Sequence, residues 1–195
     1  MPQLSLFSAD ARARELADLA GLLCGPGQIV RFGASDTARL SIVLADPRRA
    51  SALTAACVAH GLDTELATTP TGATVLRTSF RQDLVALADA WTRGAVKASP
   101  VQFELDGPVL RWWALSAGRG DGPAGYTLGL DPHAPNTHTA LATATGRLGL
   151  SSTRLGVRGG GPALRITGVK RLRRLAELVG PLPDGLACSD WPSTG

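Results

Sequence analysis

The alternation of apolar and polar positions divides the chain into short helices and strands. Leu40, Ile42 and Leu44 alternate with polar residues, a pattern typical of a strand buried on one face. Asp46-Pro47 resembles the cap and first residue of a helix. In the first half we expect, in αββαββα order, elements at 11–24, 28–32, 39–44, 47–60, 64–68, 74–79 and 82–91.

The second half repeats this order. We expect helix 112–118, strand 126–130, helix 137–147, strand 164–167 and a last helix carrying Leu172 and Leu175. Matching features recur in the same order, 93 residues on at the first helix (Gly27 and Gly120) and 88 residues on at later elements (Leu62 and Leu150), which indicates an internal repeat. The predicted organisation is a first repeat at 9–94, a linker at 95–106 with a short strand at 101–105, a second repeat at 107–180 and a flexible tail at 181–195.

Two apolar stretches stand at the start of the repeats. They read Leu19-Ala-Gly-Leu-Leu-Cys-Gly-Pro-Gly27 and Arg111-Trp-Trp-Ala-Leu-Ser-Ala-Gly-Arg-Gly120, and both end in Gly-x-Gly. A glycine inside a helix costs about 1 kcal/mol relative to alanine. Small residues such as Ala20 and Gly21 let a second helix approach closely. We therefore predict two helices packed against each other at the centre of the molecule, with Ser8 or Asp10 capping the first.

Composition places the chain among globular proteins. It has 195 residues, 44% of them apolar and 18% charged, which is enough to bury a sizeable core. Three widely spaced cysteines form no disulfide framework, so a reducing compartment is expected. No apolar run approaches the roughly 20 residues of a membrane span, and no signal peptide is evident. We expect a cytoplasmic protein, associated with the nucleoid if it is bacterial, and no membrane partner.

The charge is unevenly distributed. The net charge is +4, and arginine outnumbers lysine by 18 to 2. Residues 107–180 carry ten Lys and Arg against three acidic residues, whereas the rest of the chain carries ten against thirteen. A basic half favours an anionic partner such as nucleic acid over a merely solubilising surface. The planar guanidinium group also matches phosphates and guanine edges.

The stretch Leu19–Gly27 resembles the nine-residue motif of the LAGLIDADG homing endonucleases at its first four positions and its last. The resemblance covers about residues 10–180. It implies an α+β fold of duplicated αββαββα repeats with pseudo-two-fold symmetry, in which two saddle-shaped antiparallel sheets lie over duplex DNA. On this basis we expect a monomer that forms an internal pseudo-dimer.

The same resemblance implies that each motif ends in an acid that holds a catalytic divalent cation. The matching positions here are Pro26 and Arg119. Hard cations need oxygen ligands, so neither residue can bind one. We therefore expect no catalytic residue, no metal and no cofactor. A two-residue shift of the second motif would place Asp121 at the acid position, but only one acid would result.

Loss of both acids is also similar to the N-terminal part of the WhiA sporulation regulators, which are LAGLIDADG-derived transcription factors that do not cut DNA. Those proteins continue into a helix-turn-helix domain. Only residues 181–195 follow the second repeat here. We therefore expect a stand-alone relative of that family.

Polar residues that alternate with buried ones would point at DNA from the sheets. Leu155 and Val157 are expected in the core, which leaves their neighbours on the exposed face. The alternative is that these residues only solvate a half-buried sheet. The candidate nucleic-acid-binding residues are Arg31, Arg39, Ser41, Arg77, Arg154, Arg158 and Arg165.

Other polar groups have simpler interpretations. The basic run 170–174 lies on the expected last helix, and a solvated outer surface is favoured over a flanking phosphate contact. Asp131, His133 and His138 suggest a metal site, but Asp131-Pro132 is also a helix-capping pattern. The sequence thus predicts a catalytically inactive DNA-binding protein with a regulatory or accessory role in transcription or DNA maintenance. A protein–protein interaction module and a residual site-specific nuclease are the alternatives.

Overall fold

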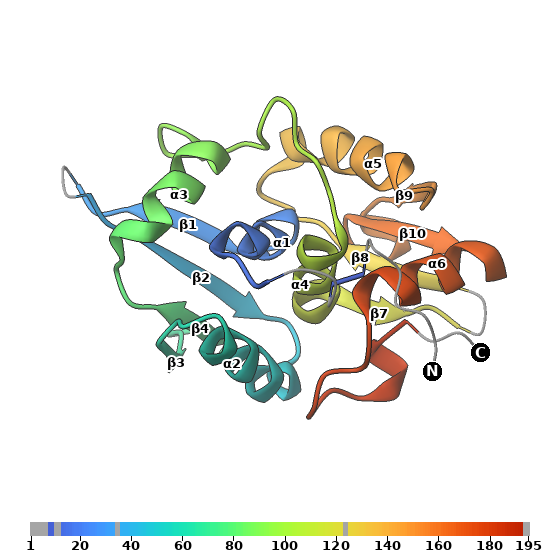
Figure 1. The fold of residues 1–195 in the computed structure, drawn as a ribbon, viewed down its shortest axis with the longest axis horizontal. Helices are drawn as coiled ribbons and strands as arrows, with labels where there is room; N and C mark the ends of the chain where they lie inside the picture. The colour runs from blue at the N-terminus through green and yellow to red at the C-terminus, as the bar shows by residue number, and fades with distance from the viewer. Residues whose placement is uncertain (1–7, 10–12, 34–35, 123–124, 193–195) are drawn as a thin grey trace.

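The computed structural model describes residues 8–9, 13–33, 36–122 and 125–192. Each half of this chain places helices on one face of an antiparallel sheet (Figure 1). The first half contains the 3-10 helix η1 (Leu16–Leu19), α1 (Ala20–Cys24), β1 (Gln28–Arg31), β2 (Ala38–Leu44), η2 (Pro47–Arg49), α2 (Ala50–Ala59), β3 (Thr64–Thr68), β4 (Thr74–Thr78), η3 (Gln82–Leu84) and α3 (Val85–Trp91).

A short hairpin of β5 (Thr92–Arg93) and β6 (Val96–Lys97) leads to the second half. That half contains α4 (Gly107–Ala117), β7 (Gly118–Gly120), β8 (Gly125–Gly129), η4 (Pro135–Thr137), α5 (His138–Arg147), β9 (Ser152–Leu155), η5 (Val157–Gly159), β10 (Ala163–Thr167) and α6 (Val169–Val179), and η6 (Cys188–Asp190) follows it.

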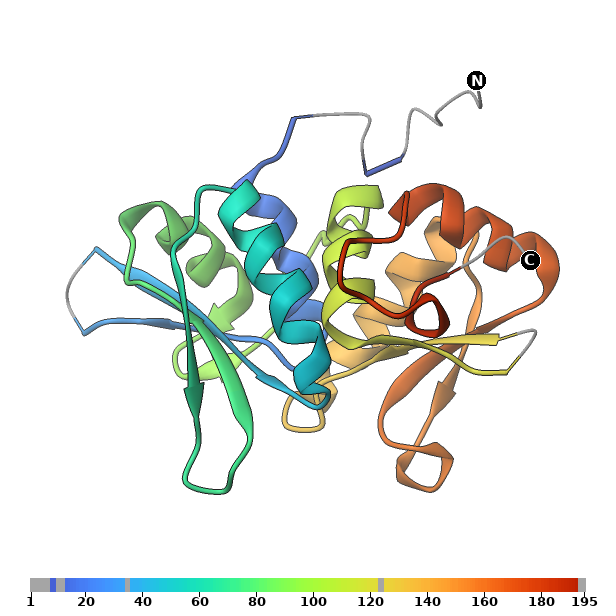
Figure 2. The same ribbon diagram turned by 90° about the horizontal axis from the view of Figure 1, so that it is seen from below.

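The two large sheets have the same topology. Their strand orders are β1-β2-β4-β3 and β7-β8-β10-β9, and all pairs are antiparallel. In Figure 2 the helices lie above both sheets, and the hairpins β3–β4 and β9–β10 descend on the two sides. The concave region between the hairpins has the shape of a saddle. The expected α+β fold class with two antiparallel sheets is confirmed.

The helices α1 and α4 pack side by side at the centre (Figure 1). Gly21 makes this contact possible. A Cβ atom at this position would overlap the carbonyl oxygen of Val109 and would lie 2.7 Å from the backbone nitrogen of Trp113. The prediction that small residues bring two central helices together is therefore confirmed.

The core continues from these helices over the covered face of each sheet. Trp91, Trp113 and Tyr126 are among the largest fully buried side chains. The Trp113 indole nitrogen donates to the carbonyl oxygen of Gly129 at 2.7 Å, which satisfies its polar group inside the core. Leu40 and Ile42 are also buried, as their alternation predicts.

Several elements differ from the sequence prediction. Within the helix expected at 11–24, the described residues 13–15 are not helical, and the helical segment begins at Leu16, where Glu15 and Asp18 form a capping box. Ser8 therefore does not cap it, and Asp10 lies outside the described residues. The second central helix begins five residues early, because the Asp106 carboxylate accepts a hydrogen bond from the Val109 nitrogen at 3.0 Å. Residues 101–105 form no strand, and the β5–β6 hairpin occupies the linker instead.

The two Asp-Pro pairs differ in role. Asp46 caps η2, as expected, and accepts from the Arg48 nitrogen at 3.0 Å. Asp131 does not cap the next helix, since Ala134 stands at that position. Its carboxylate instead accepts hydrogen bonds from the backbone nitrogen of His133, from the Lys97 ammonium group of the linker and from the Gln28 side-chain amide of the first half. The matching Asp-Pro dipeptide therefore misled the capping prediction.

Residues after α6 pack against the second half. Trp191 is 6% exposed, and its indole nitrogen donates to the Gly180 carbonyl oxygen at 3.0 Å. The Arg111 guanidinium lies 5.2 Å from the centre of the Trp191 rings. The flexibility of the tail and the domain limits stay predictions. In the described part of the chain, no helix has both the length and the apolar character needed to span a membrane.

Candidate nucleic-acid interface

Each sheet has an open face, defined as the face that the helices leave uncovered (Figure 2). Paired residues on antiparallel strands project from the same face of the sheet, so the strand register shows which face each paired side chain occupies. One cross-strand row on the first open face contains Gln28, Ser41, Arg77 and Glu65. The row at the equivalent place on the second open face contains Arg119, Thr127, Arg165 and Thr153. The two inner strands thus have a hydroxyl residue and an arginine at matching positions, although Thr127, unlike Ser41, is buried.

The expected residues of the first half lie on this face. Arg39, Ser41 and Arg77 are partly exposed and alternate with buried core residues along β2 and β4. The Arg39 guanidinium lies 4.5 Å from the centre of the Phe80 ring. Val30 is the cross-strand partner of Arg39 and is 48% exposed, so this face also carries apolar surface.

The second open face contains Arg165, as expected, and also Arg119. Arg165 forms an ion pair with Asp121 at 2.5 Å, which neutralises part of its charge. Arg119 is exposed, and its Nε donates to the Thr127 hydroxyl at 3.3 Å. In the sequence, Arg119 was visible only as a degenerate motif position. This orientation was not predicted, because the expected helix 112–118 includes Gly118, whereas Gly118–Gly120 forms strand β7.

Two expected residues project from the opposite face. Arg31 pairs with the fully buried Ala38 and forms an ion pair with Asp89 of α3 at 2.8 Å. Arg154 pairs with the buried Leu164, and its guanidinium donates to the Thr139 hydroxyl of α5 at 3.3 Å. Their assignment to the open face is wrong. Both belong to edge strands, which have one neighbouring strand and lie at the margin of the core. A charged side chain can therefore project from the helix-covered face there and reach solvent.

Arg158 also differs from its predicted setting. Strand β9 ends at Leu155, which shares the open face with Ala163, so Leu155 is not the core residue expected there. Arg158 is exposed in η5, the short turn at the end of the β9–β10 hairpin (Figure 2). It therefore lies at the rim of the saddle. Whether any of these arginines contacts DNA stays a prediction.

The central helices end at the junction of the two sheets. Gly25 and Gly118 are the C-terminal caps of α1 and α4, and Pro26 and Arg119 follow them. A cleft of about 620 Å³ opens here, lined by both of these residues, by Asp46, Arg48 and Arg49, and by Asp190. Because α4 ends at Ala117, Asp121 stands beyond β7 and away from the helix end, which argues against the shifted motif alignment.

A buried lysine occupies the end of α1. Lys97 is 8% exposed, and its ammonium group donates to the carbonyl oxygens of Gly25 and Gly27, both at 2.7 Å, and to Asp131 at 2.9 Å. Burial lowers the pKa of Lys97, and the Asp131 carboxylate counteracts this effect. Burial would raise the pKa of Asp131, but Lys97 and hydrogen bonds from His133 and Gln28 outweigh it and lower the pKa.

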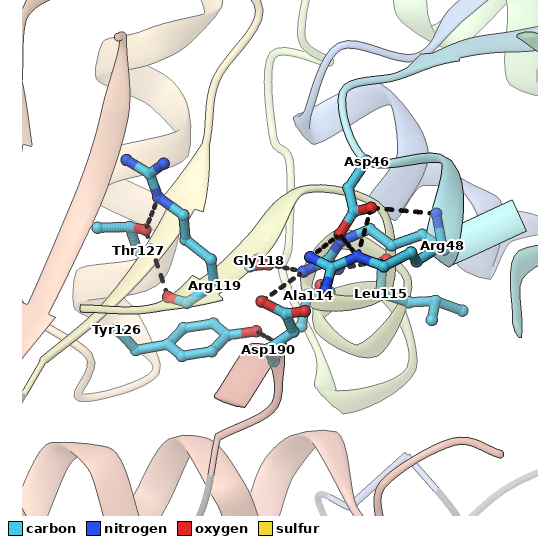
Figure 3. Close-up of polar contacts among 10 residues, drawn as sticks. Asp46, Arg48, Ala114, Leu115, Gly118, Arg119, Tyr126, Thr127 and Asp190 are labelled. Atoms are coloured by element: carbon cyan, nitrogen blue, oxygen red, sulfur yellow. Dashed lines mark hydrogen bonds and ion pairs between the residues drawn. The ribbon is translucent and has the colours of Figure 1, made fainter. Parts of the chain in front are cut away.

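A buried arginine occupies the end of α4. Arg49 is 5% exposed, and its guanidinium donates to the carbonyl oxygens of Ala114 at 3.2 Å and Leu115 at 2.8 Å and to that of Gly118. Asp190 forms an ion pair with it at 3.6 Å. Figure 3 shows Asp190 beside this helix end. Since a helix C-terminus carries partial negative charge, each central helix ends on a stabilising cation.

The donor set at this junction does not fit a divalent cation. Pro26 has no ligand atom, and Arg119 is a cation. The nearby carboxylates of Asp46, Asp131 and Asp190 already pair with Arg48, Lys97 and Arg49. In the described residues no group of three or more His, Cys, Asp or Glu side chains could hold a metal. Neither Pro26 nor Arg119 therefore supplies an oxygen ligand for a hard cation at this junction.

The remaining sequence candidates also lie in ordinary surroundings. His138 contacts the Asp131 carbonyl oxygen at 2.8 Å, and His133 is exposed. On α6, Arg171 and Arg173 are exposed while Leu175 is fully buried, so the basic run covers the outer side of the second half. The exposure of Arg171 and Arg173 agrees with the solvated-surface interpretation, whereas Asp131 has the buried role described above instead of the expected capping role.

No family model matches the sequence, and no curated protein matches it. Solved structures do match. They include the homing endonuclease I-WcaI bound to its DNA recognition sequence, with a TM-score of 0.56, 12% identity, and coverage of 84% of this chain and 79% of that chain.

Two further matches are structures of DUF199/WhiA. The N-terminal LAGLIDADG domain has a TM-score of 0.57 and 13% identity, with 85% of this chain and 82% of that chain covered. The full-length protein from Thermatoga maritima has a TM-score of 0.58 and 13% identity, with 85% of this chain covered and 55% of that chain. The chain thus has the LAGLIDADG fold, shared with a homing endonuclease and with the N-terminal domain of a WhiA protein.

Proposed function

We propose that this protein binds duplex DNA across the open faces of its two sheets and does not cleave it. The observation that carries the proposal is the matching chemistry of the two rows. Ser41 and Arg77 on the first sheet stand at the strand positions that Thr127 and Arg165 occupy on the second. Arg77 and Arg165 thus place a guanidinium donor at equivalent positions of the two sheets, which suits the two equivalent backbones of a duplex, whereas the Thr127 hydroxyl is buried and donates to the Arg119 carbonyl oxygen.

Further observations support the same ligand. I-WcaI, which has this fold, is bound to its DNA recognition sequence. Arg119 extends the second row, and Arg158 lies at the rim, where a flanking phosphate would pass. No ion pair holds Arg77, Arg119 or Arg158 within the described part of the chain, so their charges are available to phosphates.

The non-cleaving part of the proposal rests on the helix ends. Lys97 and Arg49 already neutralise the carbonyl groups of α1 and α4, and the acids around them are paired. A divalent cation would have to displace a buried side-chain charge at each position. We infer a regulatory or accessory role on DNA, carried out without hydrolysis.

A protein-binding module is the second candidate, and one observation favours it. Val30, Phe32 and Val43 of the first half are 48%, 63% and 50% exposed, and apolar exposure of this kind often marks a protein interface. The first open face is also less basic than the second. The two candidate functions can be distinguished by salt, because the affinity for DNA falls steeply as the salt concentration rises.

Fluorescence anisotropy with a random-sequence duplex, recorded over a range of salt concentrations, tests the proposal. Each phosphate neutralised by a side chain contributes about −0.9 to the slope of log affinity against log salt. The double variant Arg77→Ala/Arg119→Ala should therefore flatten the slope by about 2. The matched control is Arg171→Ala/Arg173→Ala on α6, which should leave the slope nearly unchanged.

Two results would contradict the proposal. If the α6 pair abolished binding and the open-face pair did not, the saddle would not be the DNA surface. If the wild-type protein failed to bind any duplex at low salt, the protein-partner candidate would replace it. Thermal unfolding of each variant should match the wild type, because these side chains are exposed or half-exposed.

A further inference from the structure

The two open faces differ in one respect that duplex binding does not explain. The first carries an exposed aromatic pair formed by Phe32 and Phe80, which are 63% and 38% exposed. Their ring centres lie 5.1 Å apart at an angle of 56°, and the Arg39 guanidinium covers one side of Phe80. Burial of an aromatic ring stabilises a fold, so a ring that stays partly exposed, as Phe80 does, offers a stacking surface to a ligand.

A small cleft adjoins this pair. It has a volume of about 300 Å³ and is lined by Arg39, Asp63, Thr64, Glu65, Thr78, Ser79 and Phe80. Arg39, Asp63 and Glu65 form no ion pair with one another in the described part of the chain, although all three line the same cleft. The Nε atom of Arg39 is buried without a hydrogen-bond partner. The cleft thus contains a guanidinium donor and two carboxylate acceptors that are not paired with one another.

This composition selects a neutral polar ring over a phosphate. The two carboxylates would repel a phosphate group, but they accept hydrogen bonds from ring N–H and exocyclic amino groups. A guanidinium donates to ring nitrogens and carbonyl oxygens, as arginine does to the O6 and N7 atoms of guanine. Phenylalanine rings supply a surface on which any base can stack. The charges and the aromatic ring therefore complement a nucleobase.

We propose that the cleft beside Phe80 binds an unpaired nucleobase that carries an exocyclic amine, guanine being the best fit. Guanine offers acceptors to Arg39 and donors to Asp63 or Glu65, whereas thymine has a single ring N–H donor and no amine. The ligand of the whole protein is then a duplex adjoining an unpaired base. The duplex part of this statement rests on the proposed function, and the base site can be tested separately.

Four fluorescent probes distinguish these parts: a blunt duplex, the same duplex with a short single-stranded guanine extension, the duplex with a thymine extension, and a guanine oligonucleotide alone. Extensions at the 5′ and the 3′ ends are compared. The guanine extension should raise the affinity about tenfold over the blunt duplex, the gain typical of one stacked base. The thymine extension should give a clearly smaller gain.

Three variants locate the effect. Phe80→Leu should abolish the gain from the extension and leave the blunt-duplex affinity unchanged, and Phe80→Tyr should restore the gain. Asp63→Asn/Glu65→Gln should remove the preference for guanine over thymine while keeping a stacking gain for both. Val58→Ala, exposed on α2 and outside both the open face and the cleft, is the matched control and should behave as wild type.

The outcomes separate the two proposals. If the blunt duplex fails to bind but the guanine oligonucleotide binds and depends on Phe80, the base site stands and the duplex proposal falls. If guanine and thymine extensions bind equally, or if Phe80→Leu changes all probes alike, the base site is overturned. If no nucleic acid responds to Phe80→Leu, the aromatic pair serves another class of partner and the base site is likewise overturned.

Discussion

Replacing Lys97 by methionine tests whether the buried cation at the end of α1 holds the junction together. The ammonium group has three partners, the carbonyl oxygens of Gly25 and Gly27 at 2.7 Å and Asp131 at 2.9 Å. Asp131 is 1% exposed, so removing the lysine leaves a buried carboxylate without its cation. Breaking a buried ion pair in this way costs about 3–5 kcal/mol.

That cost should be visible in thermal unfolding. For a chain of this size, 1 kcal/mol changes the melting temperature by about 2–4 °C, so Lys97→Met should lower it by roughly 10 °C. Circular dichroism melts and urea unfolding measure the change. Lys170→Met on the exposed surface of α6 is the matched control and should stay within about 0.5 kcal/mol of wild type.

The loss should also depend on pH in a defined direction. The folded-state pKa of Asp131 is lowered, so its ionised form contributes stability above the ordinary pKa of about 4, and this is lost as the pH falls through the folded-state value. Without Lys97 the carboxylate favours its protonated form. The difference between wild type and Lys97→Met should therefore be largest near neutral pH and should shrink on acidification.

A double-mutant cycle completes this test. Lys97→Met/Asp131→Asn removes both charges, so it should be less destabilised than the sum of the two single variants, because interacting neighbours are not additive. Two results would refute this reasoning: additive losses of unfolding free energy in the cycle, or a loss below about 1 kcal/mol for Lys97→Met. Either would mean that Lys97 and Asp131 do not stabilise the end of α1 together.

Three further predictions follow from the junction and the central helices. Gly21→Leu should lose about 1–3 kcal/mol or more of stability, because a side chain there meets the backbone of α4, and an unchanged melting temperature would exclude the close contact. Arg49→Met should cost about 3–5 kcal/mol, whereas Arg48→Met, at an exposed position, should cost under about 0.5 kcal/mol, as chemical denaturation can show. Duplex DNA should stay intact with magnesium or manganese; specific nicking that disappears in Asp121→Asn would restore the shifted motif alignment.

Local sequence pattern predicted the inner strands well and the edge strands poorly. On β2 and β4 both neighbours are strands of the same sheet, so the alternation of Leu40 and Ile42 with Arg39 and Ser41 is fixed by burial. On β1 and β9 the side-chain direction depends on the register with one neighbour. Both are four-residue strands with few buried positions of their own, so Arg31 and Arg154 were assigned to the wrong face although their partners Ala38 and Leu164 are near in sequence.

The buried cations could not be found from sequence. Lys97 and its partners at Gly25 and Gly27 are separated by about seventy residues, and Arg49 is similarly distant from Gly118. Neither basic residue belongs to a motif, and each resembles an ordinary surface charge. The replaced positions Pro26 and Arg119 were visible, but the groups that take over the helix ends depend on the tertiary fold.

The capping of the central helices crosses between the two halves. Arg49 of the first half closes α4 of the second, while Asp131 of the second half orients the Lys97 ammonium that closes α1 of the first. The second half expressed alone would lack Arg49 at the end of α4, and the first half would lack Asp131 as the partner of Lys97. Despite its two similar sheets, the molecule should therefore fold and unfold in one cooperative transition. If the chain were cut within residues 98–102, the fragments should acquire stable structure only when mixed.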